Sequence, residues 1–274
     1  MKCGMHLLRQ SANAELRDPV NGGSLFIHIH MKLALVCFLL FIIQTSGKSQ
    51  PEFNKPWVDS ASAIIIDPYY QNHFDFNLIA SDPKLVAIIH KASGGLKADD
   101  SCETRKVEAL RRGYLWGSYH LGKPGDPVKQ ADFYLACAKP DTNEVMALDI
   151  EDTDRTRAMS IPNTIKFIKR IKEKTGRYPL LYVNNDVCSY ISKHYSTDTT
   201  IANCKLWYAR FTEKFTALPV GIWSKYTLWQ FCSEINCKRN QQCLYTIPGT
   251  RYDMDVNVYH GTKSELKEKW PFDD

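Results

Sequence analysis

The chain has 274 residues, of which 44% are hydrophobic and 12% aromatic, and its formal net charge is +5. This length suits one large domain or two ordinary ones, and the apolar content excludes a disordered chain. No run of Lys and Arg resembles a nucleic-acid-binding tail, so we interpret the positive charge as spread over a solvated surface. The alternative is that it attracts polyanions loosely.

Residues 31–47 have the layout of a secretory signal peptide. Lys32 supplies the basic start, residues 33–43 form the apolar stretch, and small residues follow. The apolar stretch is short for a bilayer span, so a membrane anchor with a cytosolic tail is the less favoured alternative. We expect cleavage near Gly47, and we interpret residues 1–30 as an over-extended N-terminus.

Short apolar runs recur along the rest of the chain and predict strands buried on both faces, as in a parallel sheet. The first five cover residues 62–70, 84–93, 113–121, 144–151 and 178–185. Helical patterns separate several of them, at 101–113, 127–139 and 160–176. Past residue 200, loops rather than helices separate three further runs, at 205–211, 226–232 and 251–259.

This alternation of strands and helices predicts an α/β fold with one domain over residues 55–270. The expected architecture is a single closed (β/α) barrel of about eight strands, with helices mainly after the first five.

Seven of the nine cysteines follow residue 47, where an oxidising compartment favours disulfides. Cys232, Cys237 and Cys243 crowd one loop-like stretch, and Cys188 and Cys204 bracket another. Zinc is the rival for the three-cysteine stretch, but no paired Cys-x-x-Cys or nearby His-x-x-x-His supports it. Because seven is odd, we expect one thiol to stay free or to pair outside the chain.

Four acids lie at or near the ends of predicted strands, namely Asp67, Asp149, Glu151 and Asp255. Residues i and i+2 of a strand point to the same side, about 6–7 Å apart at Cα, so Asp149 and Glu151 face one direction. In a parallel barrel the carboxyl ends of all strands meet at one rim. We therefore expect the four acids to converge there.

Converging carboxyl groups have the chemistry that glycoside hydrolysis needs. One acid is kept protonated by its anionic neighbours and donates to the leaving oxygen, while another stays ionised and stabilises positive charge at the sugar carbon. The alternatives are helix caps, solvated loop residues or a divalent-metal site. Because burying two unpaired carboxylates is costly, the i,i+2 pair on an apolar strand favours a functional site.

Aromatic residues accompany the acids on the predicted strands. Tyr119, Tyr182, Tyr208 and Trp229 are the candidate substrate-binding residues. Aromatic faces stack on sugar rings and a Tyr hydroxyl bonds to substrate, although each of these residues alone is more commonly part of a core. His120 lies at the end of the third strand, where a structural role and a catalytic role are equally plausible.

Several stretches follow Asp67 in a recognisable order: KASGG (91–95), GSYHL (117–121), LDIE (148–151), LLYVNN (180–185), LWYARF (206–211), LWQF (228–231) and MDVNVY (254–259). Together they resemble the Chalaropsis-type lysozymes, glycoside hydrolase family 25, over residues 62–259. The most specific parts are the Asp-x-Glu strand and the late Trp-Gln and Asp-x-Asn pairs.

The resemblance implies a barrel of eight strands and about five helices. It also implies cleavage of the β-1,4 bond between N-acetylmuramic acid and N-acetylglucosamine in peptidoglycan, without a metal or other cofactor. Glu151 is then the proton donor, and Asp149 assists at the sugar carbon or orients the substrate's N-acetyl group. Asp67 and Asp255 support the site and tune its protonation, and Lys91 joins the substrate-binding candidates.

The leading hypothesis is therefore a secreted, monomeric muramidase that serves defence against bacteria or their digestion, outside the cell or in a digestive lumen. Its expected partner is bacterial peptidoglycan, with no nucleic acid and no stable membrane association after signal cleavage.

Two departures from the family pattern lie beside the expected groove. The usual Lys-Ala-Thr-Glu-Gly reads KASGG from Lys91, so its acidic member is missing, and Tyr69 stands where a Ser is usual. They motivate a second hypothesis, a sugar-binding or regulatory protein on the same barrel that has lost turnover. An unrelated carboxylate–metal hydrolase is the third.

Overall fold

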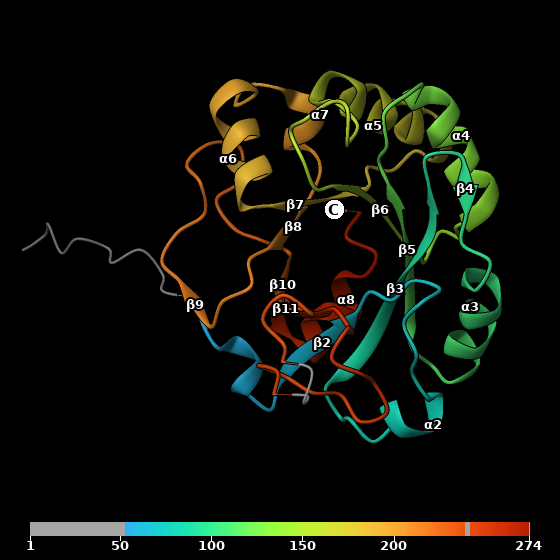
Figure 1. Cartoon of the computed structure of the whole chain (residues 1–274), viewed down its shortest axis with the longest axis vertical. Helices are drawn as coiled ribbons and strands as arrows, with labels where there is room; N and C mark the ends of the chain where they lie inside the picture. The colour runs from blue at the N-terminus through green and yellow to red at the C-terminus, as the bar shows by residue number, and fades with distance from the viewer. Residues whose placement is uncertain (1–52, 239–241, 274) are drawn as a thin grey trace, which may run out of the picture. The chain divides into compact units, whose positions relative to one another are not determined.

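The computed structural model describes residues 53–238 and 242–273 (Figure 1). The expectations for residues 1–30 and for the signal segment at 31–47 lie outside this part of the chain. Within it, no helix has both the length and the apolar character that crossing a membrane requires.

The central sheet of the described residues has nine strands, eight of which close into a barrel because β2 pairs with β3 as well as with β11. The barrel strands are β2 (Ser62–Ile66), β3 (Leu85–Gly94), β5 (Leu115–Leu121), β6 (Val145–Ile150), β7 (Leu180–Asn184), β8 (Leu206–Ala209), β10 (Leu228–Cys232) and β11 (Val256–Thr262). The closed barrel expected from the sequence is confirmed. Each predicted run contributes one strand because its β-branched and aromatic residues fill both sides of the sheet.

Helices follow each of the first five barrel strands, as expected, and cover the outside of the barrel (Figure 1). They are α2 (Phe76–Ile79), α3 (Cys102–Arg111), α4 (Pro127–Ala138), α5 (Ile161–Thr175) and α6 (Asn185–His194). In α5, Ile161, Ile168 and Ile171 are buried on one face, and Gly176 ends the helix with a φ of 74° that favours glycine.

Smaller elements complete the described fold: β1 (Phe53–Asn54), η1 (Pro56–Val58), β4 (Lys97–Ala98), α7 (Thr199–Ala202), β9 (Lys214–Phe215) and α8 (Lys263–Lys269). No helix separates β8 from β10 or β10 from β11 in the described residues, which agrees with the loops expected past residue 200.

The strand β11 corrects the expectation of a parallel barrel, because it runs antiparallel to both β10 and β2. No helix of the described residues returns the chain to the opposite rim after β10, so the chain enters β11 from the rim where β10 ended. As a consequence, Asp255 precedes its strand and still lies at the rim where the parallel strands end.

The alternation of side chains along the strands divides the interior into two cores. Inside the barrel lie residues such as Ala147 and Trp207. Their neighbours Leu148 and Tyr208 point the other way and pack between the barrel and the surrounding helices and loops. Which of two adjacent residues faces the barrel axis therefore decides whether it can reach the mouth.

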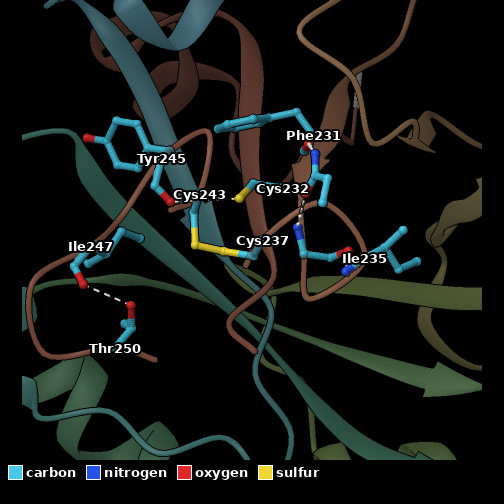
Figure 2. Close-up of a disulfide and its surroundings, with 10 residues drawn as sticks. Phe231, Cys232, Ile235, Cys237, Cys243, Tyr245, Ile247 and Thr250 are labelled. Carbon is cyan, nitrogen blue, oxygen red and sulfur yellow. Dashed lines mark hydrogen bonds between the residues drawn. A yellow bond between two sulfur atoms is a disulfide. The ribbon is translucent and has the colours of Figure 1, made fainter. Parts of the chain in front are cut away.

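The cysteine-rich loop after β10 carries a disulfide between Cys237 and Cys243, as expected (Figure 2). The sulfur of Cys232 lies close to this disulfide, because the three sulfur atoms are all within 4.8 Å of one another.

The expectation of a single free thiol is wrong, because five described cysteines are free: Cys102, Cys137, Cys188, Cys204 and Cys232. Cys188 and Cys204, which bracket the α6–α7 segment, are fully buried. Burial raises the pKa of the Cys188 thiol to about 12. These thiols pack as small apolar side chains rather than as a disulfide.

Candidate active site

The mouth of the barrel holds a small cavity of about 40 Å³ at the rim where the parallel strands end. Its lining residues are Asp67, Tyr119, Asp149, Glu151, Tyr182, Trp207, Gln230 and Asp255. The four acids named from the sequence therefore line one cavity. Asp149 and Glu151 come from the end of β6, while Asp67 follows β2 and Asp255 precedes β11.

Asp67 is a buried carboxylate whose two oxygens both accept amide hydrogen bonds. Asn257 donates through Nδ2 to Oδ1 at 2.5 Å, and Gln230 donates through Nε2 to Oδ2 at 2.8 Å. Burial raises the pKa of Asp67 well above its ordinary value and the charge of Asp255 raises it further, whereas the two amides oppose the rise.

Asp149 is also buried, with 6% of its surface exposed, but its surroundings differ. Its Oδ1 has no hydrogen-bond partner in the described part of the chain. Burial raises the pKa of Asp149 well above its ordinary value and the charge of Glu151 adds to this, while Lys91 opposes it. Since buried polar atoms are almost always paired, this oxygen is placed to accept a donor from a ligand.

Glu151 reaches the same cavity from an exposed position just beyond the strand. Asn184 fixes the backbone at this point, because its Nδ2 donates to the carbonyl oxygen of Glu151 at 2.7 Å. The sequence pair thus consists of one enclosed carboxyl group and one open to solvent, which is the kind of asymmetry that separates acid and base roles.

Asp255 adds a further carboxyl group to the lining of the cavity. It is half-buried, and burial raises its pKa to about 8, with contributions from the charges of Glu234, Glu151 and Asp253. The mouth therefore concentrates acids that disfavour one another's ionisation, and it retains protons at a pH where isolated carboxyl groups lose them.

Two of the predicted aromatic residues line the cavity and two do not. Tyr119 and Tyr182 lie at the mouth. Tyr208 instead faces α6, where its hydroxyl donates to Oδ1 of Asn185 at 2.8 Å. Trp229 is fully buried in the outer core and donates through Nε1 to the carbonyl oxygen of Arg210 at 2.7 Å.

The assignment of Tyr208 and Trp229 to the site is therefore wrong. The reason is that successive side chains along a strand point to opposite faces of the sheet. These two residues pair across β8 and β10, so they share the outer face. Trp207 and Gln230, one position away, take the inward positions and line the cavity. The Trp-Gln pair and the Asp-x-Asn pair contained the signal, since Gln230 and Asn257 are the residues that bind Asp67.

Lys91 lies outside the lining of the cavity. Its Nζ lies 5.8 Å from the ring centroid of Tyr69, and its charge opposes the raised pKa of Asp149. Lys91 thus contributes to the site by its charge and stands beside Tyr69, the residue that departs from the family pattern.

His120 is structural. It is fully buried on the outer side of the barrel, where its ring nitrogens contact Ser93 Oγ at 2.9 Å and Gln130 Oε1 at 3.1 Å. Burial lowers its pKa to about 4, so the ring is neutral at physiological pH.

The carboxylate oxygens of the cavity do not form a compact group of metal ligands. Among the described residues, the mutual spacing within 4.8 Å that a three-ligand metal site needs occurs only for Cys232, Cys237 and Cys243.

Comparison with known proteins places the chain in a family. The model of the glycosyl hydrolases family 25 matches residues 66–239. An N,O-diacetylmuramidase from Arthroderma benhamiae is 25% identical over 176 residues, which cover 59% of this chain and 72% of that protein.

Two solved structures share the fold. A bacterial lysozyme from Streptomyces coelicolor superposes with a TM-score of 0.64 at 20% identity, covering 79% of this chain and 100% of that one. A family GH25 lysozyme from Aspergillus fumigatus has a TM-score of 0.59 at 20% identity, covering 76% and 98%. Because the family model matches more than half of the 274 residues, the chain belongs to the glycosyl hydrolases family 25 and is a glycoside hydrolase.

Proposed function

We propose that this glycoside hydrolase is a muramidase, which hydrolyses the β-1,4 bond between N-acetylmuramic acid and N-acetylglucosamine in bacterial peptidoglycan. The observation that carries the proposal is the convergence of four acids in one cavity with two tyrosines on its wall. The family and the muramidase relative support the choice of substrate.

Glu151 is the proposed proton donor. Its exposed position at the edge of the cavity lets it reach the oxygen of the leaving sugar and exchange protons with solvent afterwards. A bound glycan would cover this carboxyl group and bring the leaving oxygen within its reach.

Asp149 is the proposed partner of the substrate's N-acetyl group. Its unpaired Oδ1 accepts the amide N–H of that group, and the new hydrogen bond favours the ionised form of Asp149. A negative charge on Asp149 then stabilises the positive charge that develops at the sugar carbon. Asp67 and Asp255 set the charge of the mouth around this pair.

We also propose that the enzyme acts after secretion. The signal-like segment at residues 31–47 supports this, and so does the disulfide between Cys237 and Cys243, because such bonds persist mainly in oxidising compartments. The expected setting is defence against bacteria or their digestion, by a monomer that needs no membrane partner.

The test is the identity of the bond that is cut. Purified peptidoglycan is digested with the chain from residue 48 onward, the new reducing ends are reduced with borohydride, and the fragments are weighed by mass spectrometry. We expect reduced N-acetylmuramic acid at every new end. Reduced N-acetylglucosamine at those ends would identify a different glycosidase, and no fragments at all would contradict hydrolysis.

A further inference from the structure

Asp67 lies at the centre of a chain of hydrogen bonds that crosses the barrel mouth through four side chains. Trp207 donates through Nε1 to Oδ1 of Asn257 at 2.6 Å, and Tyr182 donates through its hydroxyl to Oε1 of Gln230 at 2.7 Å. The other ends of the two amides bind Asp67. The network therefore approaches both oxygens of this carboxylate from two different strands.

The orientation of the Asn257 amide follows from its partners. An indole nitrogen only donates, so the amide end next to Trp207 must be the oxygen and the end next to Asp67 must be the NH₂ group. A second contact agrees, since Nδ2 of Asn257 also donates to the carbonyl oxygen of Ile65 at 3.2 Å. Asn257 is fully buried, so water does not offer it an alternative.

Gln230 contacts Asp67 from the other side, and its own partner is a hydroxyl group, which can donate or accept. It is 2% exposed, and its oxygen accepts the Tyr182 hydroxyl while its NH₂ group faces Asp67. Asp67 thus meets two donors and no amide oxygen. A protonated carboxyl group would need an acceptor where these amides present only N–H groups.

We propose that Trp207 and Tyr182 are positioning residues, which fix the amides of Asn257 and Gln230 so that Asp67 is held as an ionised hydrogen-bond acceptor. The inference deepens the proposed function, on which it rests, by assigning a role to two residues that line the cavity. Removal of either outer donor takes away the partner of one amide oxygen, so that the amide can turn and offer this oxygen to a protonated Asp67. For Asn257 the turn also breaks the contact with the carbonyl oxygen of Ile65.

The charged and titratable groups around Asp67 act in the opposite sense or are neutral. The carboxyl groups of Asp255 and Asp149 face it, and the phenols of Tyr119 and Tyr182 complete the wall. Burial and the charge of Asp255 favour a proton on Asp67, and the two oriented amides, together with a backbone hydrogen bond, oppose protonation. The network is therefore needed to keep the charge.

The first experiment compares Trp207→Phe with the matched control Trp229→Phe, which also removes a buried indole donor but in the outer core. The pH dependence of kcat on soluble peptidoglycan fragments is measured for each. We expect the acidic limb of the Trp207→Phe profile to move to higher pH by about half a unit or more, with the control at the wild-type position. Identical limbs in the two variants would overturn the proposal.

A second pair guards against misfolding, because it removes only one oxygen atom. Tyr182→Phe frees Gln230, while Tyr134→Phe removes a buried hydroxyl that contacts Ser118 Oγ at 2.9 Å, away from the mouth. The carboxyl titration of Asp67 is followed by difference infrared spectroscopy and assigned by its loss in Asp67→Asn. We expect protonation of Asp67 at higher pH in Tyr182→Phe alone, and an unchanged titration would overturn the proposal.

The infrared readout separates the two claims. A wild-type chain that fails to cut peptidoglycan contradicts the proposed function, whereas the titration of Asp67 still tests the positioning roles of Trp207 and Tyr182.

Discussion

His120, in the layer between the barrel and its helices, and Asp149, at the mouth of the barrel, are both buried polar residues, but their side chains are satisfied differently. In the outer layer, both ring nitrogens of His120 have partners, in Ser93 and Gln130. At the mouth, Oδ1 of Asp149 has none in the described part of the chain, although Asp149 is almost as enclosed.

This difference separates polar groups that hold the fold together from those available for chemistry. A buried group with all its partners contributes stability, whereas a buried group without one costs stability and persists where a ligand supplies the partner. The same contrast predicts opposite responses to mutation in the two regions, and each response is measurable.

The largest effect is expected from Asp149→Asn. Catalysis should fall by about 100- to 10,000-fold, because the variant loses the charge that acts at the sugar carbon. The free energy of unfolding at pH 7 should rise by about 1 kcal/mol, or 2–4 °C in Tm, since a buried charge next to Glu151 disappears. Release of reducing ends and thermal melting give the two numbers, and a fall in Tm would contradict the account.

The opposite pattern is expected from His120→Phe. The substitution keeps a ring against Phe167 but leaves Ser93 without its partner, so the free energy of unfolding should drop by about 1–3 kcal/mol. Activity per folded molecule should stay at the wild-type value. Urea unfolding and assays below the transition check both parts, and a large loss of activity with unchanged stability would place His120 in the site after all.

The pH dependence of stability sharpens the comparison. The pKa of Asp255 is about 8 in the fold and about 4 when unfolded, so the folded state binds the extra proton and stability is lost as the pH rises from 4 to 8. His90 and His120 have the opposite effect, because their pKa values are lowered to about 4 in the fold. The unfolded state binds the extra protons, so the folded protein loses stability as the pH falls from 6.5 to 4.

At pH 8 the free energy of unfolding of Asp255→Asn should therefore exceed that of the wild type by about 1 kcal/mol, a modest gain because Asp255 is only half-buried. At pH 5 the two values should lie closer together. Urea unfolding at the two pH values measures this. Equal shifts at both would show that the carboxyl group of Asp255 is not the source.

The smallest effect is expected at Tyr69, the half-buried ring that departs from the family pattern. Its turn is rigid, since Asn72 Oδ1 accepts its N–H at 2.8 Å and Arg105 Nη1 donates to its carbonyl oxygen at 2.9 Å. If the ring stacks on a sugar, Tyr69→Ala should raise KM by about 2- to 10-fold while Tyr69→Phe leaves it unchanged. Equal KM values in all three chains would remove Tyr69 from the substrate contacts.

Much of the fold was predictable because its signals are local. Each barrel strand is a separate apolar run, and the helical stripe of α5 has a clear period. The i,i+2 spacing of Asp149 and Glu151 likewise placed both at one cavity, since two residues apart on a strand means the same face.

The direction of side chains on β8 and β10 was not predictable in this way. Both strands are buried on both faces, and β8 carries an aromatic residue on each face, so Trp207 and Tyr208 look alike in the sequence. The sequence does not show which alternate residues of these strands face the barrel axis, and the hydrogen bond from Gln230 to Asp67 is what reveals it. The antiparallel direction of β11 was not predictable either, because it depends on the rim from which the preceding loop enters the strand and not on the residues of the strand itself.

The most direct test of the account is the initial rate of reducing-end release from purified peptidoglycan by Glu151→Gln. The matched control is Asp154→Asn, which removes an exposed acid from the same loop outside the cavity lining. We expect a fall of at least about 100-fold for Glu151→Gln, with an unchanged Tm, and a near wild-type rate for the control. Equal rates in Glu151→Gln and the wild type would contradict it.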